Sequence, residues 1–258
     1  MKKLLLLFII LISAVSLNAQ VKQKLLPFKF TTEVNKLPIN FNGMSLDVTF
    51  NNILNNLNLH KKGEFETTND YNVRIKRSIE KITKEYYFTA KLKSDDIKYD
   101  IDNSEINIYG GNILLGRYNG DEEVAADNHA NILLNENITK RKYVGTNGYG
   151  AKTTVESSFI LDWYIAEDKL TDSLSGKVIT FNNININEGK LLKNNCRMLV
   201  IGVGRYPFLE IGTHKKTATV SDPYEEINID KTFILYVSEI WFYNYITGKI
   251  YLKFKSSN

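Results

Sequence analysis

The sequence predicts an α+β fold in which two N-terminal amphipathic helices pack on a mainly antiparallel, twisted β-sheet that forms a sandwich or a partial barrel. Apolar residues recur with helical spacing between residues 45 and 84, whereas from Glu85 onward they alternate with a period of two. The strands after Glu85 follow one another without long helices between them. This order disfavours a parallel, doubly wound sheet.

The two expected helices each have a capping residue and one apolar face. Ser45 is placed to cap the first helix and Thr68 the second, with Asp70 in the first turn, where the helix dipole favours negative charge. We therefore expect a helical hairpin over residues 45–84. The apolar faces consist of Phe50, Ile53, Leu54 and Leu57 in the first helix and of Tyr71, Ile75, Ile79 and Ile82 in the second.

The β-rich region spans residues 85–258. Its first hairpin turns at residues 102–104, its last turns at Thr247-Gly248, and a short helix is expected at 187–194. No linker or repeat divides the chain, so we expect a single α+β domain over residues 45–258, preceded by an N-terminal arm over residues 20–44. The expected strands are 86–92, 97–101, 106–109, 131–134, 140–144, 153–165, 177–186, 197–203, 233–245 and 249–254.

Residues 1–19 have the organisation of a secretory signal peptide. Two lysines form a positive segment, an apolar run extends from Leu4 to Val15, and a short polar stretch leads to the small residue Ala19. The apolar run has about 12 residues, whereas a helix that spans a membrane needs about 20. We expect cleavage after Ala19, with Ser16 as the alternative, and an exported protein that is periplasmic, secreted or at the cell surface.

The charge of the expected mature chain is nearly balanced. The full sequence has 33 basic and 29 acidic residues, and removal of Lys2 and Lys3 leaves 31 basic residues, a net charge of about +2. Nucleic-acid binding needs a concentrated basic face, so we expect no nucleic-acid partner. No later stretch is long and apolar enough to form a transmembrane segment. The expected partner is an unidentified protein or envelope ligand.

No residue pattern indicates catalysis or metal binding. The histidines at 60, 129 and 214 lie far apart, without the spacing of zinc ligands or of a catalytic triad. The single cysteine, Cys196, begins an apolar run and is expected to be buried and inert. We therefore expect no catalytic residue, no metal and no cofactor. Paired carboxylates could still meet in the fold. Four lie on or near one long strand, Glu156, Asp162, Glu167 and Asp168, but nothing selects them as a glycosidase pair.

Three glycines interrupt a β-like stretch at residues 143–151. Asn147-Gly148 is a strong signal for a tight turn, and glycine there supplies positive φ or allows another backbone to come close. The segment is interpreted as a glycine-bent hairpin. The alternative is a ligand-contacting loop, in which Asn147 forms hydrogen bonds and Tyr149 offers a stacking surface.

The last long strand contains a second candidate binding surface. Trp241, Tyr243 and Tyr245 alternate, so their rings share one face of the strand. Such a face can bind a ligand through its aromatic rings. The alternative interpretation places these rings in the hydrophobic core.

Three segments resemble an uncharacterised family of exported bacterial proteins. They are residues 63–68 (GEFETT) with Tyr71 and Arg74, Tyr99-Asp100, and the YVGxN segment at residues 143–147 followed by Gly150-Ala151. A fourth segment, residues 188–193 (EGKLLK) leading into Leu199-Val200, fits the same resemblance. This resemblance implies a shared fold and export but no activity. In the first segment, Phe65 and Tyr71 are expected to anchor the second helix, and Arg74 to pair with Glu64 or Glu66.

The sequence leaves three classes of function. The one we favour is a periplasmic or surface binding or interaction module, because the chain is β-rich and aromatic and lacks a catalytic constellation. The second is an envelope-assembly or structural protein that acts through partners. The third is a hydrolase of cell-wall or carbohydrate substrates, which requires two carboxylates, or a carboxylate and a histidine, in one cleft.

Overall fold

The computed structural model describes residues 34–57, 62–110, 114–116, 130–167 and 177–255. The expected signal peptide and the first part of the expected arm lie outside these residues. Contacts divide the chain after Val34, and the unit described below is Asn35–Asn258. In this unit two helices precede the sheets, which confirms the α+β class, and the sheets do not close into a barrel.

The two N-terminal helices are α2 (Leu46–Leu57) and α3 (Thr68–Ile82). The sequence predicts Thr68 as the cap of α3, but the structure shows that Thr67 is the cap. Thr67 has an extended backbone, and its Oγ1 accepts a hydrogen bond of 3.1 Å from the backbone nitrogen of Asp70. The expected position of Asp70 in the first turn is confirmed.

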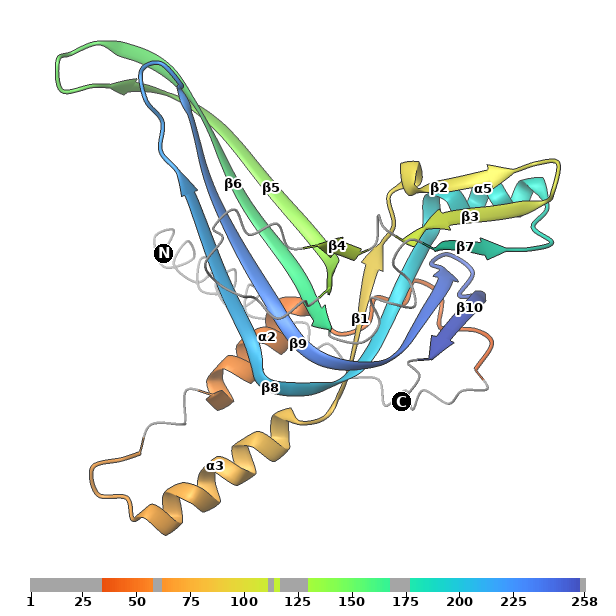
Figure 1. Cartoon of the computed structure of the whole chain (residues 1–258), viewed down its shortest axis with the longest axis horizontal. Helices are drawn as coiled ribbons and strands as arrows, with labels where there is room; N and C mark the ends of the chain where they lie inside the picture. The colour runs from red at the N-terminus through yellow and green to blue at the C-terminus, as the bar shows by residue number, and fades with distance from the viewer. Residues whose placement is uncertain (1–33, 58–61, 111–113, 117–129, 168–176, 256–258) are drawn as a thin grey trace, which may run out of the picture. The chain divides into compact units, whose positions relative to one another are not determined.

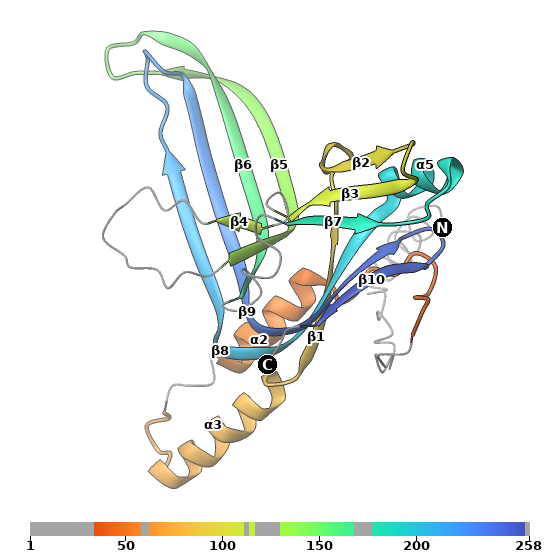
Figure 2. The ribbon, with the colours of Figure 1, turned by 45° about the vertical axis from the view of Figure 1, so that its right-hand side comes forward.

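The two helices contact the sheet unequally. Helix α2 buries Phe50, whose ring lies edge-on to the rings of Trp163 and Phe233 at centroid distances of 5.5 and 5.7 Å. In α3 the buried residues are Ser78 and Ile82, both in the C-terminal half. Figures 1 and 2 show α3 leading away from the strands, while α2 lies beside them. The second helix therefore packs on the rest of this unit near its end and not along its length.

Seven strands form the larger sheet. Its neighbouring strands are antiparallel except for β6 and β9, which are parallel, and β10 pairs with the C-terminal half of β9. In spatial order the strands are β1 (Glu85–Lys91), β8 (Cys196–Lys216), β9 (Tyr224–Asn244), β6 (Lys152–Glu167), β5 (Ala130–Thr146) and β4 (Leu114–Gly116), with β10 (Ile250–Lys255) beside β9.

A smaller sheet carries the third described α-helix. It consists of β2 (Ile97–Asp100), β3 (Glu105–Tyr109) and β7 (Val178–Phe181), and a single 3₁₀ turn, η2, precedes it. Helix α5 (Ile186–Asn195) follows β7. Its Gly189 lies against the ring of Tyr99, where an added Cβ would come within 2.9 Å of the ring carbons.

Four of the strands are longer than the sequence indicates. Strands β8 and β9 have 21 residues each, and the expected strands 131–134 and 140–144 are parts of the single strand β5. The register of β8 and β9 shifts between Gly204 and Leu209, and Figure 1 shows both strands bending. Beyond this bend, residues 135–146, 152–162, 224–232 and 209–216 pair side by side. We refer to these four stretches as the long ladder.

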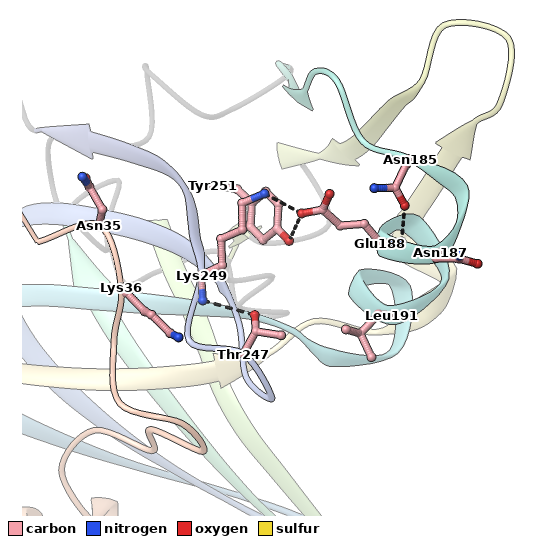
Figure 3. Close-up of a pocket in the computed structure, with 9 residues that line it drawn as sticks. All are labelled: Asn35, Lys36, Asn185, Asn187, Glu188, Leu191, Thr247, Lys249 and Tyr251. Atoms are coloured by element: carbon pink, nitrogen blue, oxygen red, sulfur yellow. Dashed lines mark hydrogen bonds and ion pairs between the residues drawn. The ribbon is translucent and has the colours of Figure 1, made fainter.

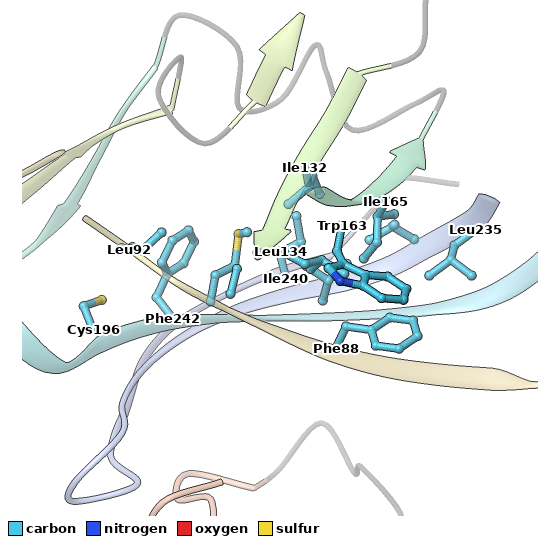
Figure 4. Close-up of a cluster of buried hydrophobic side chains, with 14 of the residues drawn as sticks. Phe88, Leu92, Ile132, Leu134, Trp163, Ile165, Cys196, Leu235, Ile240 and Phe242 are labelled. Atoms are coloured by element: carbon cyan, nitrogen blue, oxygen red, sulfur yellow. The ribbon is translucent and has the colours of Figure 1, made fainter. Parts of the chain in front are cut away.

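Buried aromatic rings form the centre of the hydrophobic core (Figure 4). Phe88 stacks on Phe233 at a centroid distance of 4.4 Å, and Trp163 stacks on the same ring at 6.0 Å. Burial of a side chain of this size contributes about 1.5–3 kcal/mol. Cys196 is buried in this core as expected, and burial raises the pKa of its thiol, which makes the group unreactive.

Candidate functional site

A pocket of about 610 Å³ lies where three distant parts of the chain meet (Figure 3). Helix α5 contributes its first turns, the β9–β10 turn and β10 contribute a second side, and the chain before α2 contributes a third. Its volume falls in the range of small-molecule sites. The lining residues are Asn35, Lys36, Asn185, Asn187, Glu188, Leu191, Thr247, Lys249 and Tyr251.

Glu188 is the centre of the polar contacts in this pocket. Its Oε1 accepts hydrogen bonds of 2.6 Å from the Lys249 ammonium and of 2.6 Å from the Tyr251 hydroxyl. Partial burial raises the pKa of Glu188, but the hydrogen bonds from Lys249 and Tyr251 and the charge of Lys249 outweigh it, so the pKa is lowered. Burial and the hydrogen bond to Glu188 raise the pKa of Tyr251. The carboxylate is therefore ionised and the phenol neutral at pH 7.

Local structure places these groups side by side. The Asn185 side chain caps α5 by accepting a 3.0 Å hydrogen bond from the Glu188 backbone nitrogen, so Glu188 occupies the third helical position. Lys249 directly precedes β10 and Tyr251 is the second residue of this strand, and the Lys249 ammonium lies 4.7 Å from the centroid of the Tyr251 ring. The Tyr251 ring also stacks on Phe181 at 5.6 Å, which fixes its position.

The turn before β10 holds the third side of the pocket. Gly248 has a φ of +73°, and there is no room for a side chain at this position. An added Cβ would lie 2.0 Å from the carbonyl oxygen of Leu37. The backbone nitrogen of Leu37 donates a 2.8 Å hydrogen bond to the Gly248 carbonyl, and Lys36 forms a β-bridge with Lys249. Glycine at this turn thus brings residues 35–37 against β10.

The lining is rich in hydrogen-bond donors. Asn35, Lys36 and Asn187 are exposed, and no carboxylate of a described residue forms an ion pair with Lys36. Counting Lys36, Lys249 and Glu188, the lining has a net charge of +1. Glu188 is its single carboxylate, whereas glycosidases use two. The arrangement suits binding of a polar ligand better than hydrolysis.

Asn147 and Tyr149, expected as possible ligand contacts, lie in the turn between β5 and β6. The Oδ1 atom of Asn147 accepts hydrogen bonds from the backbone nitrogens of Tyr149 and Ala151, at 3.0 and 2.9 Å. Gly150 has a φ of +82°, so this is a glycine-bent hairpin. The Tyr149 side chain is 99% exposed. Neither residue lines the pocket.

Trp241 and Tyr243 are core residues, which corrects their assignment to a binding face. They are 1% and 0% exposed. The Trp241 indole donates a 2.6 Å hydrogen bond to Glu239, and the Tyr243 hydroxyl donates one of 2.7 Å to the carbonyl oxygen of Phe41. Because both rings are enclosed, neither presents a surface to a ligand.

No local sequence signal marks the pocket, because its three sides come from segments separated by up to about two hundred residues. The expected helix at 187–194 and the expected strand at 249–254 are both present, yet nothing marks Glu188, Lys249 or Tyr251 as partners. Lys36 lies in the expected N-terminal arm, which the sequence predicts to be extended or to form one edge strand, without indicating that it lies beside Lys249.

No group of three His, Cys, Asp or Glu side chains among the described residues is placed to hold a metal ion. His60 and His129 lie outside the described residues. None of the described helices is long and apolar enough to cross a membrane.

Comparisons of the chain with protein-family models, with curated proteins and with solved structures found no match. The resemblance to exported bacterial proteins therefore stays a prediction.

Proposed function

We propose that this chain is an exported binding module that takes a small polar ligand in the pocket between α5 and β10. The observation that carries the proposal is the pocket itself, which collects amide, ammonium, hydroxyl and carboxylate groups around about 610 Å³. A signal-peptide pattern at residues 1–19 supports export. The proposed compartment is the periplasm or the cell surface.

The lining favours a ligand with several hydroxyl groups and one negative charge. Asn35, Asn187 and Thr247 carry side chains that exchange hydrogen bonds with hydroxyl groups. Lys36 has no ion pair with a described carboxylate and would hold the anionic group, while Glu188 neutralises Lys249. Leu191 adds an apolar contact. A uronic acid or another acidic sugar has this chemistry.

Isothermal titration of the mature chain with D-galacturonate and D-glucuronate tests the proposal, with D-galactose and D-glucose as neutral comparators. We expect the acidic sugars to bind more tightly than the neutral ones. Lys36→Gln should weaken binding of the acidic sugars about tenfold, which is about 1.4 kcal/mol, and leave the neutral sugars unchanged. Asn187→Ala should weaken binding of both kinds.

Lys140→Gln is the matched control, because Lys140 is an exposed lysine of the long ladder and lies outside the pocket lining. It should bind like the unchanged chain. Equal weakening by Lys36→Gln and Lys140→Gln would contradict a site at the pocket. Tighter binding of neutral sugars would contradict the anionic part of the proposal, and no binding of any sugar would contradict a saccharide ligand altogether.

Docking to an envelope partner protein is a second candidate function, and Phe65 favours it. The Phe65 side chain is 95% exposed, so it does not anchor α3 as the sequence suggested. Its neighbour Glu66 forms two 2.7 Å contacts with Arg74, and Glu66 Oε2 accepts a 3.0 Å hydrogen bond from the Gly63 nitrogen. An exposed aromatic ring on a turn that hydrogen bonds and an ion pair hold in place has the properties of an interface anchor.

Cross-linking in the native cell tests this second function. A photo-reactive phenylalanine analogue at position 65 should yield one dominant protein adduct. The same analogue at position 149, in place of the equally exposed Tyr149, serves as the control. Identical adduct patterns at the two positions, or no protein adduct at position 65, would contradict docking through Phe65.

A further inference from the structure

A row of acidic residues crosses the long ladder, away from the pocket. Glu136 of β5 is the Cα partner of Asp162 of β6, Asp162 is the partner of Asp230 of β9, and Asp230 is the partner of Gly212 of β8. Paired residues of neighbouring strands project their side chains to the same face. The three carboxylates therefore lie on one face, in a line across the strands.

Two of these carboxylates have buried oxygen atoms that lack a donor. Asp162 is 6% exposed, and although its Oδ2 accepts a 3.2 Å hydrogen bond from the Tyr164 hydroxyl, its Oδ1 is buried and has no hydrogen-bond partner. Asp230 Oδ1 is likewise buried without a partner, while its Oδ2 lies 3.7 Å from His214 Nε2. The carboxylate of Asp230 lies over Gly212, where a Cβ would be 3.4 Å from Oδ2.

Two ionised carboxylates in this position would be unfavourable. Each buried oxygen without a donor costs free energy, and the like charges on paired residues repel each other. Burial raises the pKa of Asp162, hydrogen bonds from Tyr164 and Asn228 oppose the rise, and the charges of Glu136 and Asp230 raise it further. A single proton between the two carboxylates satisfies one oxygen as donor and the other as acceptor, and it removes one charge.

A metal ion and a catalytic role account less well for the same atoms. Asn228 Oδ1 is a third buried oxygen without a partner, but no three His, Cys, Asp or Glu side chains of the described residues are placed around a metal. The Oδ1 atoms of Asp162 and Asp230 are buried, so a substrate does not reach them. Proton sharing requires only the two carboxylates.

We propose that Asp162 and Asp230 share one proton and so form a pH-dependent clasp between β6 and β9. In the protonated form the hydroxyl of one carboxyl group donates to the free oxygen of the other. As the pH rises, this proton passes to solvent and both groups become anionic beside Glu136. Repulsion across the parallel β6–β9 step then weakens the long ladder.

Charged and polar groups of three strands surround the two carboxylates. Glu136 of β5 adds negative charge, Tyr164 of β6 donates a hydrogen bond to Asp162, and Glu210 of β8 pairs with Thr232, two residues from Asp230. His214 Nε2 of β8 lies 3.7 Å from Asp230 Oδ2, and the charge of Glu136 disfavours a negative charge on Asp162. Stability from the clasp is therefore present at low pH and lost as the pH rises.

Carboxyl-carbon NMR of the unchanged mature chain tests the shared proton directly. Between pH 3 and pH 9, the side-chain carboxyl resonances of Asp162 and Asp230 should each move in the same two steps, because coupled groups titrate as a pair. The second step should lie above the usual range of aspartate. Independent single steps at ordinary aspartate values for both residues would overturn the proposal.

Urea unfolding adds a second readout with matched variants. In Asp162→Asn the amide donates to Asp230 at every pH, so the urea midpoint of the unchanged chain should fall relative to this variant between pH 5 and pH 9. Glu156→Gln, on the same strand but exposed and paired with Lys142, should follow the unchanged chain. Parallel pH profiles of the unchanged chain and Asp162→Asn would overturn the proposal. So would a calcium-dependent rise in midpoint that Asp162→Asn abolishes, which would indicate a cation site instead.

Discussion

At Gly202 and Gly204, in the buried half of β8, backbone packing leaves no room for a side chain. An added Cβ at Gly202 would lie 2.6 Å from the carbonyl oxygen of Tyr236, and one at Gly204 would lie 2.7 Å from that of Ile82. Neither glycine has positive φ, so close approach and not backbone conformation explains them. Both glycines lie inside the continuous strand β8.

Gly202→Ala should destabilise the protein by about 1–3 kcal/mol, because the added methyl group forces β8 and β9 apart. Gly148→Ala is the control, since a Cβ at Gly148 would meet no atom within 4 Å. Urea unfolding of both variants checks the prediction. A change at Gly202 no larger than that at Gly148 would show that β8 and β9 accommodate the methyl group.

The Glu66–Arg74 pair makes a pH-dependent contribution to stability. The hydrogen bond from Arg74 and then that from the Gly63 backbone nitrogen lower the pKa of Glu66 to about 2. A carboxyl group with a lowered pKa stabilises the folded state above its unfolded pKa of about 4.3, and this contribution is lost as the pH falls toward 2. Both groups are solvent-accessible, so the contribution is small.

Arg74→Met should raise the pKa of Glu66 and flatten the fall in unfolding free energy between pH 5 and pH 2. The pH dependence of urea unfolding measures this effect. Glu64→Gln, at an exposed neighbour, should keep the slope of the unchanged chain. The sequence predicts that Arg74 pairs with Glu64 or Glu66. An equal pH dependence of the unfolding free energy in Arg74→Met and in the unchanged chain would contradict its pairing with Glu66.

Residue types and spacing predict some positions and not others. Burial of Cys196 and the turn at Asn147 follow from their immediate neighbours. Burial of Trp241 and Tyr243 does not, because alternation shows that two side chains share a face without showing what covers it. Residues 240–243 are buried one after another, since this part of β9 is covered on both faces. The partners that enclose Tyr243 include Phe41, from a distant segment.

Among the elements, α2 and α3 have similar sequence patterns but different roles. Helix α2 supplies Phe50 and Ile53 to the core, whereas α3 contributes buried residues near its C-terminal end. Helical periodicity predicts an apolar face and its direction, and the predicted caps place the start of each helix within one residue. How much of that face is covered depends on the tertiary arrangement, which periodicity does not contain.

Phe50→Ala should destabilise the protein by about 3–5 kcal/mol, because it leaves a cavity between α2, Trp163 and Phe233. Val48→Ala, on the exposed side of the same helix, should change the unfolding free energy by about 0.5 kcal/mol or less. Chemical unfolding followed by tryptophan fluorescence measures both. Similar losses in the two variants would contradict docking of α2 through Phe50.

The long strands were predicted too short for a physical reason. In residues 209–216 and 224–232 most side chains are exposed or half-buried, so apolar alternation is weak there. A strand is recognised in a sequence by the alternation that one buried face produces. The long ladder has few buried residues on either face. Its pairing is held by backbone hydrogen bonds and by cross-strand contacts such as the 2.9 Å hydrogen bond from the Tyr143 hydroxyl to Glu225.

For the whole molecule, export and ligand binding are linked proposals. The signal-peptide pattern predicts delivery across a membrane, and one buried cysteine means that the described unit is held by its core and not by disulfides. N-terminal sequencing of the protein from its native cell should find Gln20 as the first residue, or Leu17 if Ser16 is the cleavage site. A retained Met1 would contradict the predicted signal peptide.

Ligand mapping by NMR on the mature chain tests the central claim most directly. On addition of D-galacturonate, amide resonances of residues 35–36, 185–191 and 247–251 should shift together and saturate at one affinity, because these segments line the pocket. Shifts confined to residues 143–151 or to the long ladder would place the ligand elsewhere. Either pattern, or no shift at all, would contradict a binding site between α5 and β10.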